Sequence, residues 1–401
     1  MARYDNYRVY NVEFSNEKHV QLFKELEEQS DSMSFIGHPR EVGQKLSILV
    51  SAHKVADLTL LLKHYRVIHR ILTYNFQEKI DRSYSSVAAV GTDVTKFDWH
   101  HFYHLETIYE WMNSLAKLYP NLITILDMGG STQGTAIKGV KLSHKNTNKT
   151  IFIEAGIHAR EWIAPAAANY IISNLLRSNE QDIQNLAKSY NWIIFPCINP
   201  DGYRFTFECD RMWRKNRQLF MTTYGVDLNR NYPVHWNSTG SSTDPCRYDY
   251  AGPSEGSELE TQRLIKFIQN NVNKEQIRTY IALHSYSQMI MFPYGYSKEL
   301  APNYDDLKEL GQRASVAIKE LSGKIYTSGS LMETIYPSSG GSVDWAYSQG
   351  IPIAYTIELR GPPDSEDMFL LPAEEILPTA QEAFAAIRNI VEGAADKGYY
   401  K

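Results

Sequence analysis

The pattern of hydrophobic and polar positions divides the chain near residue 75. In residues 7–14 apolar and polar side chains alternate, which is typical of a half-buried strand, and residues 16–29 place leucine and phenylalanine at helical spacing. The segments that follow are a strand at 33–37, a strand at 45–51, a helix at 56–67 and a strand at 68–75. This βαββαβ order predicts a small α+β ferredoxin-like domain over residues 1–82.

The next segment loses this periodicity. Residues 75–96 are rich in small and polar side chains, so we expect an irregular linker over residues 83–96 that a protease can cut. Lys79, Arg82 and Lys96 are the candidate cleavage sites for a trypsin-like protease. An interdomain connector without a processing role fits the composition equally well.

From residue 97 to residue 401, long helical patterns alternate with apolar strands. Helices are predicted at 105–120 and 164–178, and strands at 122–129, 140–144, 150–157, 192–198, 279–285 and 351–359. Alternation of this kind predicts an α/β domain whose central sheet is flanked by helices. Ligand sites in such sheets gather where strands end and loops begin.

Histidine and glutamate residues, which can bind a metal ion, lie at the ends of three of these strands. His158 and Glu161 come directly after the strand at 150–157, while His284 and Glu358 lie at the ends of two later strands. An imidazole nitrogen and a carboxylate oxygen three positions apart can bind one Zn²⁺, and a catalytic zinc needs one more protein ligand. The pair alone also occurs by chance as a surface or salt-bridged pair, and His284 alone would fit a core histidine bonded to the backbone.

Composition narrows the function classes. The chain has 401 residues, 43% of them hydrophobic and 22% charged, and a net charge of -5, so a nucleic-acid surface or an anionic-membrane patch has little support. No apolar run approaches the roughly 18–20 residues of a membrane span. The first ten residues lack the apolar core of a signal peptide, so we expect any secretion signal to have been removed. Glycosylation sequons at Asn148 and Asn237 lean weakly towards secretion.

Three cysteines are too few for a disulfide-stapled scaffold, and they show no C-x-x-C zinc spacing. Cys197 lies in an apolar run, where a buried thiol is expected. Cys209 and Cys246 lie in polar segments, and we expect them to form a disulfide because an oxidising compartment leaves exposed thiols vulnerable.

Seven short motifs occur in a recognisable order over residues 97–401. They are GIHAREW, NPDGY, RMWRKNR, GVDLNRN, HSYSQ, IYPSSGGSVDW and TIELR. Their order and spacing resemble those of the digestive zinc metallocarboxypeptidases of the carboxypeptidase A and B type, which implies a metallocarboxypeptidase-like mixed sheet. The N-terminal unit resembles the activation propeptide of that family. The resemblance therefore implies a secreted procarboxypeptidase.

The resemblance implies a role for each matching position. His158, Glu161 and His284 match the ligands of one zinc ion, with the fourth position left for water. Asp227 matches a residue that holds the ring of a zinc histidine, although a structural capping role fits the sequence nearly as well.

Two further matches carry the reaction. Glu358 matches the general base, and Arg214 matches the arginine that stabilises the oxyanion of the tetrahedral intermediate. Without the motifs, a strand-end salt bridge between Glu358 and Arg360 would be the default interpretation. Arg214 would then belong to a solvated basic loop.

The resemblance also implies how substrate is bound. Arg230 offers the planar fork that binds a C-terminal carboxylate, and Asn229 and Tyr336 match its companions. Tyr336 precedes a small-residue stretch that would let its loop close over substrate. Arg160 matches a residue on the non-primed side of the cleft, and Tyr286 is also carried over as a substrate contact.

The matching specificity pocket carries no charge. Val343 occupies the position that resembles the pocket floor, and Met291, Leu331 and Thr356 match other lining positions. An aspartate at the floor would select lysine or arginine, so valine predicts a carboxypeptidase A-like preference for aromatic or aliphatic C-terminal residues. The alternative is basic specificity, with an acidic side chain from the unusually long loop at 361–368 reaching the pocket.

Two other readings remain open. The chain could be another zinc amide hydrolase of the same superfamily, although the propeptide and Tyr336 argue against this. It could also be a peptide-binding scaffold that has lost the chemistry, although the complete set of ligands argues against that. The expected partners are peptide C-termini and a trypsin-like activating protease, with a single Zn²⁺ per chain. We expect a monomer that binds neither nucleic acid nor membrane.

Overall fold

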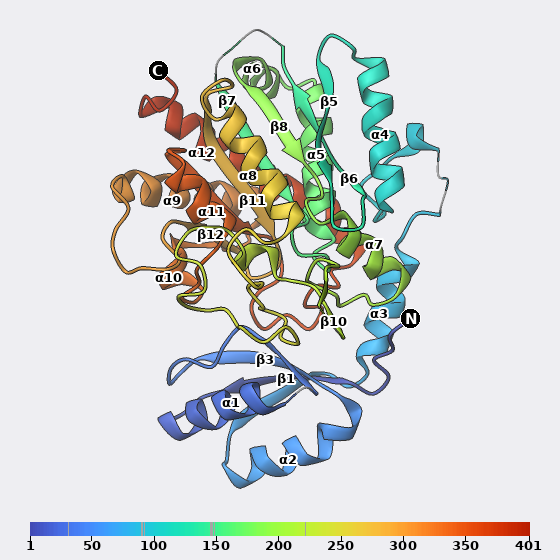
Figure 1. The fold of residues 1–401 in the computed structure, drawn as a ribbon, viewed down its shortest axis with the longest axis vertical. Coiled ribbons are helices and arrows are strands. Elements are labelled where there is room, and N and C mark those ends of the chain that lie inside the picture. Colours follow the sequence, from blue (N-terminus) through green and yellow to red (C-terminus); the bar gives the residue numbers. More distant parts are fainter. Residues whose placement is uncertain (31, 90, 92, 145–146, 148, 221) are drawn as a thin grey trace. The chain divides into compact units, whose positions relative to one another are not determined.

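The computed structural model describes residues 1–30, 32–89, 91, 93–144, 147, 149–220 and 222–401, so Asn148 of the first sequon lies outside the described residues. The chain divides into two compact units. Residues 1–86 and 361–372 form the first unit, and residues 87–360 and 373–401 form the second (Figure 1).

The first unit is built on a four-stranded antiparallel sheet in the order β2-β3-β1-β4. Its elements are β1 (Arg8–Glu13), α1 (Glu17–Gln29), β2 (Met33–Ile36), β3 (Lys45–Val50), the short η1 (Ala52–Lys54), α2 (Val55–His64), β4 (Ile68–Thr73) and α3 (Phe76–Ser85). The helices pack because Val20 and Phe23 of α1 and Leu58 and Leu62 of α2 face one apolar cluster with the sheet. The predicted βαββαβ order is confirmed.

Helix α3 corrects the interpretation that the chain loses its periodicity from residue 75 onwards. Phe76 and Ile80, one turn apart, are both buried, so this segment has an apolar face that forms a helix against the rest of the unit. Lys79 and Arg82 therefore lie on a helix, whereas Lys96 is the exposed last residue of the short η2 (Val94–Lys96).

The long acidic loop is paired within this first unit. Lys79 Nζ lies 2.6 Å from Asp367 Oδ1 and 3.5 Å from Glu366 Oε1, and Arg70 Nη2 lies 2.8 Å from Asp364 Oδ2. The three acidic side chains that could have made the specificity pocket basic-selective thus have cationic partners on β4 and α3.

The second unit is an α/β domain around an eight-stranded mixed sheet in the order β13-β12-β14-β11-β7-β8-β6-β5. The strands are β5 (Ile123–Gly130), β6 (Ala136–Leu142), β7 (Thr150–Ala155), β8 (Asn191–Phe195), β11 (Ile277–His284), β12 (Met289–Phe292), β13 (Thr327–Ser330) and β14 (Ile353–Glu358), with a separate hairpin of β9 (Leu219–Phe220) and β10 (Thr223–Tyr224). The neighbouring strands β14, β11, β7 and β8 are parallel. The expected mixed sheet is confirmed.

Helices flank this sheet, with α8 in front of it and α5 behind it in the view of Figure 1. The helices are α4 (Leu105–Leu118), α5 (Ile163–Arg177), α6 (Gln181–Ser189), α7 (Pro200–Glu208), α8 (Leu259–Asn271), α9 (Tyr304–Ser322), α10 (Leu331–Thr334), α11 (Ser342–Ser348) and α12 (Ile376–Asp396), with short turns η3 (Leu228–Arg230) and η4 (Ala373–Glu375). Every residue of β7 is buried, as expected for a parallel strand covered on both faces.

The predicted disulfide is not formed. All three cysteines are free, and Cys197 is buried as expected. Cys209 ends α7 and donates its N–H to Phe205, whereas Cys246 belongs to a separate turn in which its N–H bonds to Asp244. Each backbone is thus fixed by its own local hydrogen bond. In the described part of the chain, no helix is long and apolar enough to cross a membrane.

Candidate active site

Three strand ends bring the site together. His284 and Glu358 are the last residues of the parallel strands β11 and β14, and they are partners in the register of those strands. His158 and Glu161 follow β7, which pairs with β11 on the other side. The chain leaves β7 at Gly156, whose φ is 66° and whose added Cβ would lie 3.1 Å from the backbone of Cys197. A glycine there permits both the turn and the close approach.

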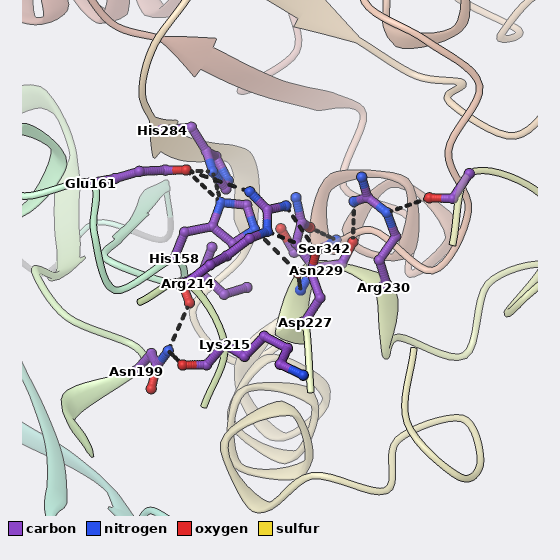
Figure 2. Close-up of polar contacts among 12 residues, drawn as sticks. His158, Glu161, Asn199, Arg214, Lys215, Asp227, Asn229, Arg230, His284 and Ser342 are labelled. Atoms are coloured by element: carbon purple, nitrogen blue, oxygen red, sulfur yellow. Dashed lines mark hydrogen bonds and ion pairs between the residues drawn. The ribbon is translucent and has the colours of Figure 1, made fainter. Parts of the chain in front are cut away.

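The side chains of His158, Glu161 and His284 converge in the interior (Figure 2). Glu161 Oε1 lies 2.8 Å from His158 Nδ1, and Glu161 Oε2 lies 3.2 Å from His284 Nδ1. The two Nδ1 atoms are 3.1 Å apart, and one ligand atom from each of the three residues lies within 4.8 Å of the others. Two imidazole nitrogens and one carboxylate oxygen are a typical donor set for catalytic zinc. The residues present therefore fit a zinc ion.

The electrostatics of two of these ligands favour metal binding. Burial and the nearby Arg214 lower the pKa of His158, which keeps its imidazole neutral. Burial raises the pKa of Glu161, but the two imidazoles lower it by a larger amount. The net pKa lies below its usual value, so the carboxylate is ionised. Neutral imidazole and ionised carboxylate are the forms that bind a metal. Burial lowers the pKa of His284, but hydrogen bonding and charge from Glu161 raise it by more, so the pKa lies above its usual value.

Asp227 orients both the first histidine and Arg214. Its Oδ1 lies 3.2 Å from His158 Nε2, and its Oδ2 accepts from Arg214 Nε at 3.0 Å and Nη2 at 2.8 Å. The carboxylate is fully buried, and although burial raises its pKa, Arg214 and His158 hold that pKa well below its usual range. This contact directs His158 Nδ1 towards Glu161, which is how a carboxylate behind a histidine prepares it as a ligand.

Glu358 and Arg214 also lie at the cluster. Burial raises the pKa of Glu358, although His284 acts in the opposite direction. The alternative of a salt bridge between Glu358 and Arg360 is wrong, because Arg360 pairs instead with Glu375 and Glu382. Arg214 Nη1 lies 3.8 Å from Glu161 Oε1, so its guanidinium reaches the edge of the cluster.

The expected carboxylate-binding residues form a second group. Arg230 is buried and donates from Nε to the Gly240 carbonyl at 2.8 Å and from Nη2 to the Tyr336 hydroxyl at 3.0 Å. Its Nη1 donates to the Asn229 carbonyl at 2.8 Å. The guanidinium is therefore held in one orientation by three hydrogen bonds, and Figure 2 shows it beside Asn229. Arg160 and Tyr286 are buried in the same unit.

None of the four expected pocket positions carries a charge, and all but Leu331 are buried. Met291 of β12 and Thr356 of β14 are directly opposed in the antiparallel pair. Val343 of α11 belongs to the apolar cluster of the unit, against which the partly buried Leu331 packs. The nearest carboxyl in sequence, Asp344, accepts from Gly295 N at 2.8 Å, and burial raises its pKa to about 7.

Two polar residues were passed over in the sequence analysis. Glu154 is the second-to-last residue of β7 and follows the apolar run Ile151–Ile153, and Ser342 is the first residue of α11. They bond to each other, with Ser342 Oγ donating to Glu154 Oε1 at 2.6 Å. The signal that could have found Glu154 is its single charge inside an apolar run.

Comparisons with known proteins agree with this geometry. Residues 108–386 match the zinc carboxypeptidase family, and residues 10–83 match the carboxypeptidase activation peptide. The chain is 39% identical to zinc carboxypeptidase A 1 of Anopheles gambiae over 405 residues, covering 100% of this chain and 92% of that protein. It is 35% identical to carboxypeptidase B of Rattus norvegicus over 398 residues, covering 96% of this chain and 93% of that protein.

A solved structure gives the same picture. The crystal structure of the carboxypeptidase A from Helicoverpa armigera superimposes with a TM-score of 0.88 at 28% identity, covering 98% of this chain and 99% of that one. The family match spans the zinc cluster, and the activation-peptide match lies within the first unit. The chain therefore belongs to the zinc carboxypeptidases, as a procarboxypeptidase with its activation peptide and a Zn²⁺ cofactor.

Proposed function

We propose that this carboxypeptidase removes aromatic or aliphatic C-terminal residues, is secreted, and is activated by trypsin-like cleavage. The observation that carries the specificity is the uncharged character of the pocket positions, with Val343 at the floor. The residues named below carry the reaction in this proposal.

His158, Glu161 and His284 hold the zinc ion. When bound, zinc supplies a Lewis acid that polarises the scissile carbonyl and lowers the pKa of water towards 7. Glu358 takes the proton of the attacking water and delivers it to the leaving amine. Its raised pKa suits this double role, because a general base works best with a pKa near the operating pH.

Arg214 and Arg230 each stabilise one of the two negative charges on the substrate. Arg214, fixed by Asp227, faces the oxyanion that develops at the scissile carbonyl. Arg230, supported by the Tyr336 hydroxyl, binds the free C-terminal carboxylate together with Asn229. Recognition of that carboxylate restricts hydrolysis to the last peptide bond.

The preference for apolar residues follows from desolvation. A lysine or arginine side chain in this pocket would lose its hydration and find no anion, which costs several kcal/mol. Each methylene of a leucine or phenylalanine gains roughly 0.8 kcal/mol when it is buried instead. We therefore expect kcat/KM for C-terminal phenylalanine to exceed that for lysine by at least about 10²–10³.

Activation by cleavage has a preferred position in this proposal. A protease must bind its target as an extended segment, and Lys79 and Arg82 lie within α3. The Lys79 side chain is also paired with Asp367. Lys96 is exposed and lies outside that helix, which favours it as the first cut.

The test uses two synthetic peptides that differ only in a C-terminal phenylalanine or lysine. Intact protein should be nearly inactive, and limited trypsin treatment should raise turnover of the phenylalanine peptide without changing the zinc content. A chelator should abolish this turnover, and zinc should restore it. Equal activity before and after cleavage would refute the activation proposal, and preferential release of lysine would refute the specificity proposal. Failure to release either residue would refute the reaction.

A further inference from the structure

A buried carboxyl group in this unit has no role in the reaction described above. Glu154, near the end of β7, is 1% exposed, and its Oε1 accepts from Ser342 Oγ at 2.6 Å and from Tyr280 Oη at 2.8 Å. Burial raises the pKa of Glu154. Burying a carboxyl group costs free energy even when it is hydrogen-bonded, so its contacts point to a task.

One of the two donors to Glu154, Ser342, also bonds to Asn229, a residue on the proposed substrate side of the site. Ser342 is the first residue of α11, and its backbone N–H donates to Asn229 Oδ1 at 2.9 Å (Figure 2). A side-chain amide has one acceptor oxygen and one NH₂ donor. With its oxygen held by Ser342, Asn229 presents the NH₂ group elsewhere.

The two glycines that precede Ser342 pack closely against Asn229 and Arg230. Gly340 has a φ of 70°, and a Cβ added to it would lie 2.3 Å from the Arg230 carbonyl oxygen. A Cβ added to Gly341 would lie 3.4 Å from Asn229 Oδ1. The start of α11 therefore lies directly against Asn229 and Arg230, the two residues proposed to bind the carboxylate. A shift of Ser342 would move the N–H group that donates to Asn229 Oδ1.

We propose that Glu154, acting through Ser342, is a positioning residue for Asn229. The carboxyl of Glu154 anchors the Ser342 hydroxyl, and the Ser342 N–H then fixes the amide of Asn229. The NH₂ group rather than the oxygen of that amide faces the C-terminal carboxylate of the substrate. A reversed amide would place its oxygen against the carboxylate and repel it. This inference rests on the proposed role of Asn229 in carboxylate binding.

The position of Ser342 allows a graded test. Ser342→Ala removes the hydroxyl and keeps the N–H, whereas Ser342→Pro removes both. Proline is well tolerated at the first residue of a helix, and the preceding Gly341 is extended, as proline requires. Activated enzyme should lose about threefold to tenfold in kcat/KM with alanine and more with proline, through KM more than kcat.

A double-mutant cycle with Asn229→Ala separates positioning from general damage. If Ser342 acts through Asn229, Ser342→Ala and Ser342→Pro should add almost nothing in the Asn229→Ala background. Independent effects that multiply would overturn the proposal. Glu154→Ala should reproduce Ser342→Ala, and Glu154→Gln should restore most of the loss because its amide oxygen still accepts from Ser342.

Tyr280→Phe is the matched control. It removes the other donor to the same Glu154 oxygen, but Tyr280 lies on β11 and, in the described part of the chain, forms no hydrogen bond with Asn229. It should leave KM within about twofold of wild type, whereas a loss equal to that of Ser342→Ala would overturn the Ser342 route.

Binding of N-acetyl-phenylalanine and of its amide to each zinc-loaded variant supplies a readout besides activity. Wild type should prefer the carboxylate by at least about tenfold, and Ser342→Pro should lose much of that preference. A wild-type enzyme without the preference would refute the proposed function itself. A wild-type preference that Ser342→Pro retains would refute only the positioning role.

Discussion

The zinc-binding half of the site and the proposed specificity pocket differ in the charge of the side chains that form them. The expected ligands His158, Glu161 and His284 are all ionisable and buried, and Asp227 and Arg214 form an ion pair beside them. Around Val343 the lining positions carry no charge, and the nearby Asp344 has a pKa raised to about 7 by burial. The expected zinc ligands thus form a concentrated polar cluster, whereas the positions proposed to line the specificity pocket are uncharged.

This difference shows how reaction and preference are encoded separately. The reaction needs charges that are held in place before substrate arrives, because such groups stabilise developing charge without reorganisation. The preference needs the exclusion of charge, since an unpaired buried cation is costly. Changes to the polar half should therefore alter rate or metal binding, and changes to the apolar half should alter which substrate is accepted.

The largest effect is expected at Glu358. Glu358→Gln keeps the shape of the side chain and removes the base, so turnover should fall by roughly 10²–10⁴. Zinc content should stay at wild-type level, because Glu358 is outside the ligand group. Metal analysis beside peptide turnover checks both points. Glu161→Ala serves as the contrasting variant, and it should lose metal as well as activity. A Glu358→Gln enzyme that works near the wild-type rate would contradict the assignment.

The next effect concerns the apolar half. Val343→Asp places a carboxylate at the pocket floor and should move the ratio of phenylalanine to lysine release by about 10² or more towards lysine, because the incoming cation gains a partner. Paired peptides measured on activated wild type and variant give this ratio. Val343→Asn is the matched control, since it is polar without charge and should weaken both substrates. An unchanged ratio in Val343→Asp would remove Val343 from the pocket.

A smaller effect is expected behind the zinc cluster. Asp227→Asn weakens the acceptor that orients His158 and Arg214, so zinc affinity should fall by about 10–100-fold. Competition with a chelator measures this directly. Asp201→Asn is the control, because Asp201 is also a buried aspartate but accepts from Ser131 and Gln133 instead. Equal losses in both variants would mean that the effect is one of general stability.

The sequence predicted the class of the fold and the strand ends at which the expected site residues lie, but it missed an edge strand of the sheet. His158, Glu161, His284 and Glu358 stand at strand ends, and the structure places the three ligands within reach of one ion. Periodicity reveals a strand when it is apolar and buried, as β7 is. It does not reveal β13, whose residues Thr327–Ser330 are small and polar and form an edge of the sheet.

The remaining errors share a physical cause, which is that long-range contacts decide what local composition leaves open. Helix α3 was expected to be irregular because its sequence is polar, yet burial of Phe76 and Ile80 stabilises it. The predicted pairing of Cys209 with Cys246 rested on the expected exposure of their thiols rather than on geometry. Glu154 was overlooked because its partners, Ser342 and Tyr280, lie 188 and 126 residues away in the sequence.

The smallest predicted effect tests whether the apolar half stays uncharged. Burial raises the pKa of Asp344 to about 7 in the folded protein, from a reference value of 3.8. Between these two values the folded state holds a proton that the unfolded state releases, so the free energy of unfolding should fall as pH rises through this window. The slope contributed by this one group is at most about 1.4 kcal/mol per pH unit. Asp344→Asn should remove it.

Thermal unfolding of the intact protein from pH 4.5 to 7.5 measures this slope. The Tm of wild type should fall relative to that of Asp344→Asn by several degrees as pH rises, while Asp182→Asn, whose side chain is 74% exposed, should run parallel to wild type. Below about pH 7 the group next to Val343 is then mostly neutral, and the pocket excludes charge even though its sequence contains an aspartate. A wild-type Tm that rises against Asp344→Asn over this window would show an ionised, paired Asp344. A charged group would then lie next to Val343, and the distinction between a charged and an uncharged half of the site would no longer hold.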